Sequence, residues 1–228
     1  MSAPPASAAS LTDRVSIGLL LLTAVSGIVD AVSFLGLGHI FTANVTGNLV
    51  FLAFAAVGAP GISVARSITS LAAYLSGAVL GGYFGRGLVG PLRRRWLLLG
   101  AMCEATLLVA AAIAVIAIDA DSTALAHRQY AAIVLTALAM GLRSATVRRL
   151  DVPGLTTTTV LTMTVTGLIA DFVAAGGSHP HTRRRLGSIA SLFIGAALGA
   201  LLLRFGLAVP LIVATVCVLV ATIAYADA

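Results

Sequence analysis

The sequence predicts an all-α, polytopic membrane protein with six transmembrane helices, two broken or re-entrant Thr-Gly helices and an inverted internal repeat. Composition, the lengths of the apolar runs and the placement of arginine predict this class. Of the 228 residues, 59% are hydrophobic and 10% are charged, whereas a soluble domain carries about 25% charged residues. The mean hydropathy is +1.06. This balance leaves too little polar surface for a soluble enzyme or a nucleic-acid-binding domain.

The N-terminal segment precedes the first apolar run of the chain. Residues 1–13 are rich in Ala, Ser and Pro and carry no early positive charge, so they do not read as a cleavable signal. We expect a disordered tail over residues 1–13 and a single transmembrane domain over residues 14–228. The two cysteines, Cys103 and Cys217, lie in apolar runs and are expected to be small buried hydrophobic residues, not a disulfide or a metal-binding pair.

Eight apolar runs follow the tail. A spanning helix needs about 20 apolar residues, because each residue rises ~1.5 Å through ~30 Å of hydrocarbon. Two of the runs, near residues 40–57 and 155–175, begin with Thr, Asn and Gly, and this composition is not typical of a simple transmembrane helix. The other six predict spanning helices at residues 15–36, 67–85, 96–118, 130–147, 186–203 and 207–225.

The arginines decide how the two Thr/Gly-rich runs are counted. If all eight runs cross, the arginine pair at 148–149 and the triplet at 183–185 fall on opposite sides, which breaks the positive-inside rule. If the Thr/Gly-rich runs enter and leave by the same face, ten arginines share one side and three lie opposite. We therefore expect both termini in the cytoplasm. Eight ordinary spans with a weak charge bias are the alternative.

The two halves of the domain, about residues 15–118 and 130–226, resemble each other. Gly77-Ala-Val-Leu-Gly81 matches Gly195-Ala-Ala-Leu-Gly199, 118 residues later. Thr42-Ala-Asn-Val-Thr-Gly47 matches Thr162-Met-Thr-Val-Thr-Gly167, 120 residues later, and Gly27-Ile-Val-Asp-Ala31 matches Gly141-Leu-Arg-Ser-Ala145, 114 residues later. With three spans in each half, the second half starts on the opposite side. This predicts an inverted repeat, the architecture of many transporters.

Two stretches of the chain resemble a known family. Gly27-Ile-Val-Asp-Ala-Val-Ser-Phe, followed by Phe41-Thr-Ala-Asn-Val-Thr-Gly-Asn48, is similar to the YoaK-type bacterial membrane proteins, a domain family of unknown function. Met140-Gly-Leu-Arg-Ser-Ala-Thr-Val-Arg-Arg149 and Thr164-Val-Thr-Gly-Leu168 resemble the second signature of that family, although Arg143-Ser144 stands where an amide pair is expected. The resemblance implies a bacterial inner-membrane location and a transport role without a known substrate.

The Thr-Gly motifs and one acid are the expected substrate pathway. Irregular backbone at membrane depth is tolerated only where it is buried in protein or lines a cavity. Half-helix N-termini would direct their amides at an anionic or carbonyl-bearing solute. Close helix packing by small residues is the alternative reading. The expected pathway residues are Asp30, Asn44, Thr46, Gly47, Asn48, Thr164, Thr166 and Gly167.

Four ionisable residues fall within apolar runs, where charge is costly and indicates function. Glu104, Arg143 and Asp171 are expected at similar depth in the cytoplasmic half, where they can form a neutralised cluster. Asp30 is expected to stand apart, nearer the outer face. The carboxyl groups of Asp30 and Glu104 suit proton coupling or cation handling, whereas Arg143 can instead snorkel to the surface.

Four glycines form small-xxx-small patterns, which let helices approach closely. We expect Gly77, Gly81, Gly195 and Gly199 to be helix-packing residues, either between the two halves or between the protomers of a homo-oligomer.

The predicted function is movement of a small molecule or ion across the bacterial inner membrane, driven by a gradient. The expected partners are membrane lipid and that solute, and neither a nucleic acid, a metal nor a cofactor is expected. A channel and a non-transporting membrane scaffold are the alternatives. An intramembrane enzyme ranks lower, because Asp30, Glu104 and His39 show no nucleophile–base spacing. We therefore do not expect an enzyme.

Overall fold

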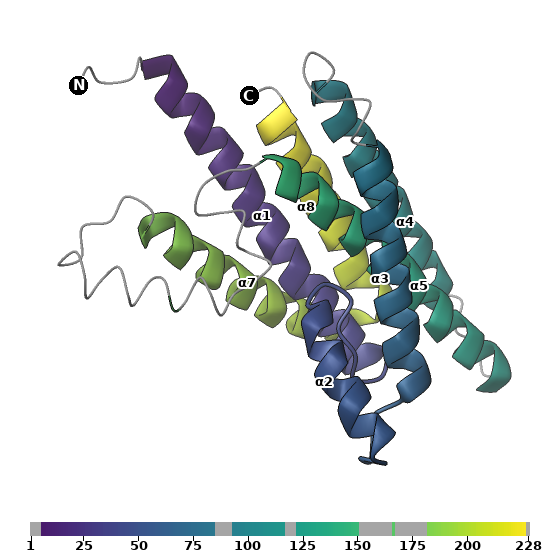
Figure 1. The fold of residues 1–228 in the computed structure, drawn as a ribbon. Coiled ribbons are helices and arrows are strands. Elements are labelled where there is room, and N and C mark those ends of the chain that lie inside the picture. The colour runs from purple at the N-terminus through teal and green to yellow at the C-terminus, as the bar shows by residue number, and fades with distance from the viewer. Residues whose placement is uncertain (1–5, 85–92, 117–121, 151–165, 167–181, 227–228) are drawn as a thin grey trace.

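The computed structural model describes residues 6–84, 93–116, 122–150, 166 and 182–226, and this part of the chain is helical without strands (Figure 1). A short helix, α2 (Val45–Ala56), and a 3-10 turn, η2 (Leu203–Phe205), accompany six longer helices. The predicted all-α class is therefore confirmed. The six longer helices follow the six predicted runs and are α1 (Ala6–Gly36), α3 (Val64–Phe84), α4 (Arg93–Ile116), α5 (Ser122–Leu150), α7 (Thr182–Leu202) and α8 (Ala208–Ala226).

Helix length and composition make the chain a multi-pass membrane protein. Five described helices, α1, α3, α4, α5 and α7, are long and apolar enough to cross a bilayer. The described apolar stretch of α8, Ala208–Ala224, is slightly shorter. In Figure 1, α1 begins and α8 ends on the same, upper side of the molecule.

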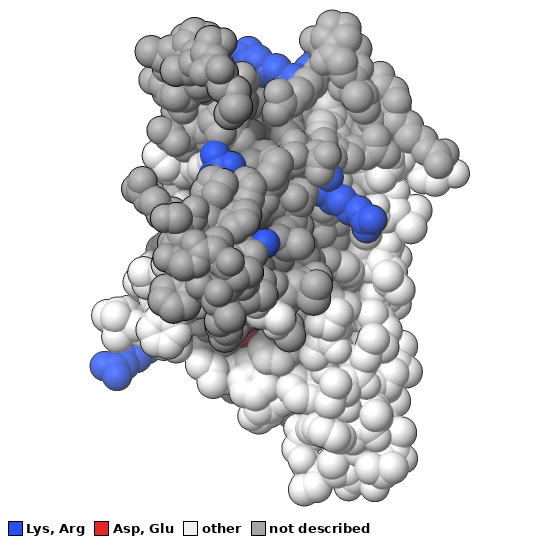
Figure 2. All heavy atoms as spheres, turned by 60° about the vertical axis from the view of Figure 1, so that its left-hand side comes forward, with Lys and Arg blue, Asp and Glu red and all other residues white. Residues whose placement is uncertain are grey.

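The outer surface of the bundle is apolar over large areas. Ile113, Phe193 and Ile223 expose 61%, 74% and 68% of their surface. Figure 2 shows one face of the molecule, whose described lower right part carries neither basic nor acidic side chains. Such a surface suits contact with lipid tails, because lipid is as apolar as these side chains.

The first Thr/Gly-rich run forms a short helix preceded by irregular backbone. α2 contains 12 residues, which span only ~18 Å at 1.5 Å per residue. The chain between α1 and α2 is not helical, and Gly38 in it has a φ of +103°, a value that favours glycine. A broken helix at this position is what the sequence predicted. The corresponding second run lies outside the described residues, apart from Thr166.

The N-terminal tail differs from its prediction. α1 begins at Ala6, so residues 6–13 of the expected disordered tail continue the first helix. The physical reason is the local composition. After Pro5 the segment contains several alanines and no helix breaker, and alanine has the highest helix propensity.

Two pairs of helices pack closely at glycines, and each such line of contact is called a glycine seam below. On α3, an added Cβ at Gly77 would overlap the backbone carbonyl of Leu138 on α5. On α7, an added Cβ at Gly195 would overlap the backbone carbonyl of Ala24 on α1. α3 therefore packs directly against α5, and α7 directly against α1, at distances that only glycine permits.

The two seams correspond residue by residue. Gly141 faces the carbonyl of Tyr74 and the amide of Ala78, whereas Gly27 faces the carbonyl of Leu192 and the amide of Ala196. Each residue of one seam has a counterpart in the other at a constant distance along the sequence. Positions 27 and 24 of α1 correspond to 141 and 138 of α5, 114 residues later. Positions 74, 77 and 78 of α3 correspond to 192, 195 and 196 of α7, 118 residues later. Gly81 packs against Leu142 and Gly199 packs against Ile28, and these two pairs are related by the same distances along the sequence.

Candidate functional site

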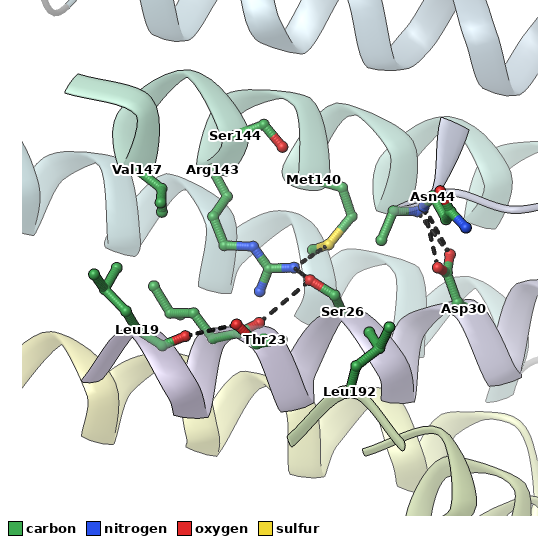
Figure 3. A pocket seen from close by; sticks show the side chains of 12 residues that line it. Leu19, Thr23, Ser26, Asp30, Asn44, Met140, Arg143, Ser144, Val147 and Leu192 are labelled. Atoms are coloured by element: carbon green, nitrogen blue, oxygen red, sulfur yellow. Dashed lines mark hydrogen bonds between the residues drawn. The ribbon is translucent and has the colours of Figure 1, made fainter. Parts of the chain in front are cut away.

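A cavity of about 90 Å³ lies between α1 and α5, near the start of α2 (Figure 3). α1 supplies one wall and α5 the other, while Leu192 of α7 closes one side. The polar groups that line the cavity are Thr23, Ser26, Asp30, Asn44, Arg143 and Ser144. The cavity therefore combines an acidic and a basic side chain on helices that are long and apolar enough to span a membrane, where ionisable residues are rare.

Asp30 holds the backbone that leads into α2. Its Oδ1 accepts hydrogen bonds from the backbone N–H groups of Ala43, Thr42 and Asn44 at 2.8, 3.2 and 3.3 Å. Its Oδ2 accepts a hydrogen bond from the Asn44 N–H at 3.0 Å. Three consecutive amides thus converge on one carboxylate, which is the arrangement of an anion-binding nest.

The position of this carboxylate follows from the start of α2. The first amides of a helix have no intrahelical acceptor and need an outside partner. The side chain of Asn44, the N-cap residue, makes no capping hydrogen bond. Asp30 bonds the N–H groups of residues 42–44, which lead up to the first helical residue Val45, and its negative charge is favourable near a helix N-terminus.

Arg143 lies further along the cavity from Asp30 and is 6% exposed. Its Nη2 donates a hydrogen bond to Ser26 Oγ at 2.9 Å and also contacts the sulfur of Met140. Its Nη1 lies 3.2 Å from Oε1 of Glu104 on α4, which is 3% exposed. These two residues form a buried ion pair that joins α5 to α4.

Asn48 of α2 holds the same irregular segment through hydrogen bonds to Phe41. Its Oδ1 accepts a hydrogen bond from the Phe41 N–H at 2.8 Å, and its Nδ2 donates to the Phe41 carbonyl and to Ser70 Oγ. Ser70 Oγ also donates to the Phe41 carbonyl at 2.7 Å. Asp30 and Asn48 together hold residues 41–44 between α1 and α3.

The expected pathway residues divide into two groups. Asp30 and Asn44 line the cavity. Thr46 is exposed, an added Cβ at Gly47 would meet the ring of Phe41, and Asn48 is buried outside the cavity lining. In the second half, Thr166 is exposed in a helical position. Thr164, Gly167 and Asp171 lie outside the described residues.

The prediction that Asp30 stands apart from the other ionisable residues is wrong. Asp30 and Arg143 line the same cavity, because α1 and α5 face each other across it. The guanidinium of Arg143 does not reach the surface, since Glu104 and Ser26 hold it inside. Among the described residues, Glu104 and Arg143 meet as expected. Asp30, which was not expected near them, lines the same cavity as Arg143.

Sequence reasoning missed Ser26, Ser144 and Tyr74. Ser26 lies four residues before Asp30, one helical turn away, and this spacing could have identified it. Ser144 occupies the position that corresponds to Asp30 at the offset of 114, and its hydroxyl is hydrogen-bonded by the Tyr74 hydroxyl at 2.8 Å. No signal in the sequence pairs Tyr74 with Ser144, because 70 residues separate them.

Comparisons with known proteins identify relatives. A family model described as "Protein of unknown function (DUF1275)" matches residues 18–224. The chain is 33% identical over 155 residues to the UPF0700 transmembrane protein YoaK of Bacillus subtilis (strain 168). This match covers 68% of the chain and 65% of the relative. No solved structure matches the chain.

Proposed function

This chain belongs to the DUF1275 family of membrane proteins, and we propose that it moves a small solute across the bacterial inner membrane, driven by an ion or solute gradient. The cavity that holds Asp30 and Arg143 carries this proposal. Ionisable residues inside a membrane are costly, and they commonly mark ion and substrate pathways. Three such residues, Asp30, Glu104 and Arg143, meet in or beside one cavity.

The position of the cavity supports the same function. Its two main walls come from α1 in the first half and α5 in the second half. Transporters with repeats place their sites near the bilayer midplane at the repeat interface, close to the ends of broken helices. Here the irregular chain before α2 supplies Ala43 and Asn44 to the wall.

An inverted repeat is part of the proposal. The two glycine seams support it. α1 packs against α7 in the way that α5 packs against α3, and equivalent residues make the contacts in both seams. A pseudo-twofold axis relating the halves would generate this exchange. Inversion further requires that α2 and its counterpart in the second half do not cross, and the 12 residues of α2 are too few to do so.

Sided cysteine labelling tests the inversion and the cytoplasmic termini. In a variant with Cys103 and Cys217 replaced by Ala, single cysteines are introduced as Ser10→Cys and Pro60→Cys. We expect an impermeant maleimide to label Pro60→Cys from outside intact cells. Ser10→Cys should react only after the membrane is permeabilised, because one span separates the two positions.

The second half needs its own pair of cysteines, Asp151→Cys and Ser178→Cys. An inverted repeat requires that both react only from the cytoplasmic side. Labelling of these two positions from opposite sides, or of Ser10→Cys and Pro60→Cys from the same side, would contradict it and favour eight spans.

Asp30 is the proposed coupling residue, and Asp30→Asn tests the transport function. Asn keeps one oxygen for the amides of residues 42–44 but removes the charge that would hold a proton or cation. In proteoliposomes, we expect the solute-induced current on a solid-supported membrane to fall by at least ~10-fold, since losing a buried charged partner costs several kcal/mol.

Thr106→Ala is the matched control, because Thr106 is exposed and its hydroxyl only bonds the Met102 carbonyl of its own helix. This variant should transport like the wild type. Undiminished flux in a folded Asp30→Asn variant would instead favour a channel. Absence of uptake for every solute in a broad panel would overturn the transport function itself.

A further inference from the structure

The cavity holds one acidic and one basic side chain on different walls. Figure 3 shows the carboxylate of Asp30 at one end and the guanidinium of Arg143 nearer the middle, with Ser26 between them. Ser26 accepts the Arg143 hydrogen bond and lies one helical turn before Asp30. A turn of α-helix rises ~5.4 Å, so the two charged groups are separated by about one turn along the wall.

The guanidinium has donors to spare. Arginine carries five N–H donors, and Arg143 uses Nη2 for Ser26 and Met140. Its Nη1 is buried and lies 3.2 Å from Glu104 Oε1, with which it forms the ion pair. Arg143 itself lines the cavity, so its other N–H groups can bond an acceptor on a bound solute.

The carboxylate also has spare capacity. A carboxylate offers about four acceptor sites. Oδ1 of Asp30 accepts three amide hydrogen bonds, whereas Oδ2 accepts only the one from Asn44. Oδ2 can therefore accept a further donor from the cavity.

The ionisable side chains of the site carry an excess of negative charge. Glu104 pairs with Arg143, whereas Asp30 has no basic partner of its own among the described residues and is only partly offset by the amides of Thr42, Ala43 and Asn44. An added anion would increase this negative charge in a medium of low dielectric constant. A solute that places an ammonium group at Asp30 would not.

We propose that the cavity binds a small zwitterion, with an ammonium group at Asp30 and a carboxylate at Arg143. This inference rests on the proposed transport function and names its substrate class. The volume of about 90 Å³ limits the solute to a few heavy atoms beyond the two charged groups. Ser26 and Ser144, which also line the cavity, supply hydroxyls for the remaining polar atoms.

The test compares one zwitterion with its two halves. The probes are L-alanine, ethylamine, propionate and an equimolar mixture of ethylamine and propionate, together with glycine and L-serine as further small zwitterions. Thermal stabilisation of the purified protein in detergent reports binding, and uptake of the radiolabelled probes into proteoliposomes reports transport. We expect the zwitterions to stabilise the protein and to be taken up, and ethylamine, propionate and their mixture to do neither.

Two variants and one control connect the binding to the two charged ends. Asp30→Asn and the double variant Glu104→Gln/Arg143→Met should each lose the stabilisation by zwitterions, and the double variant avoids leaving a lone buried charge. Thr106→Ala should keep it. If Asp30→Asn does not fold, the double variant still tests the binding of the solute's carboxylate at Arg143.

Several outcomes would overturn the substrate class. Ethylamine that binds as well as L-alanine would show a cation site without a role for Arg143. Propionate that binds as well as L-alanine would show an anion site. Uptake of an unrelated solute with no response to zwitterions would reject this inference while leaving transport intact, whereas no uptake of any solute would reject the proposed function as well.

Discussion

Replacing Glu104 by Gln is expected to destabilise the folded protein by about 3–5 kcal/mol, since it leaves a buried arginine without its counter-charge. Arg143 is 6% exposed, and its Nη1 lies 3.2 Å from the Glu104 carboxylate. Gln keeps nearly the same shape, so the loss reports the charge and not a cavity. SDS-induced unfolding of the purified protein in mixed micelles measures the effect.

A second substitution should restore most of that stability. The double variant Glu104→Gln/Arg143→Met removes both charges, and buried ion pairs can often be replaced by uncharged groups at little cost. We expect the double variant to be more stable than Glu104→Gln alone. The single variant Arg143→Met completes the comparison. If the loss of stability in the double variant equals the sum of the losses in the two single variants, Glu104 and Arg143 are not coupled and the ion pair contributes no stability.

Introducing a methyl group into either glycine seam is expected to separate two helices. Gly77→Ala should force α3 away from the Leu138 carbonyl of α5, and Gly195→Ala should force α7 away from the Ala24 carbonyl of α1. Overpacking of this kind costs about 1–3 kcal/mol, and backbone atoms cannot move aside as a flexible side chain can. The same SDS titration would report both losses.

Gly82→Ala is the control for these variants. Gly82 lies on the same helix as Gly77, but no atom lies within 4 Å of its added Cβ. Since alanine is the better helix former, this variant should be as stable as the wild type or up to ~1 kcal/mol more stable. Equal stability of Gly77→Ala and Gly82→Ala would contradict a tight seam, and very different losses for Gly77→Ala and Gly195→Ala would contradict matched seams.

The helices and the glycine patterns could be predicted from the sequence. A helix in a membrane satisfies its own backbone hydrogen bonds, so the length and hydropathy of each run are enough to identify it. For the same reason the Thr- and Asn-rich start of the run near residue 40 predicted the break before α2. The spacing of Gly77 and Gly81, repeated at Gly195 and Gly199, indicated close helix packing.

The candidate site depended on which helix faces meet, and the sequence predicted only its members. Asp30, Glu104 and Arg143 stand out in apolar runs wherever the helices lie. Their partners are set by the packing of the helices. Asp30 meets the amides of residues 42–44 because α2 starts beside α1. Arg143 meets both Glu104 and Ser26 because α5 packs against α4 and approaches α1 at this position.

The sequence by itself therefore determined the all-α membrane class, the helix-forming runs and the residue types able to carry charge inside the bilayer. Each of these properties is local, since it depends on neighbours within one helix. Only the tertiary structure decided that Asp30 bonds the backbone before α2 and shares a cavity with Arg143. Such a pairing depends on the rotation and depth of helices far apart in the chain, which close contacts such as those of Gly77 and Gly195 fix.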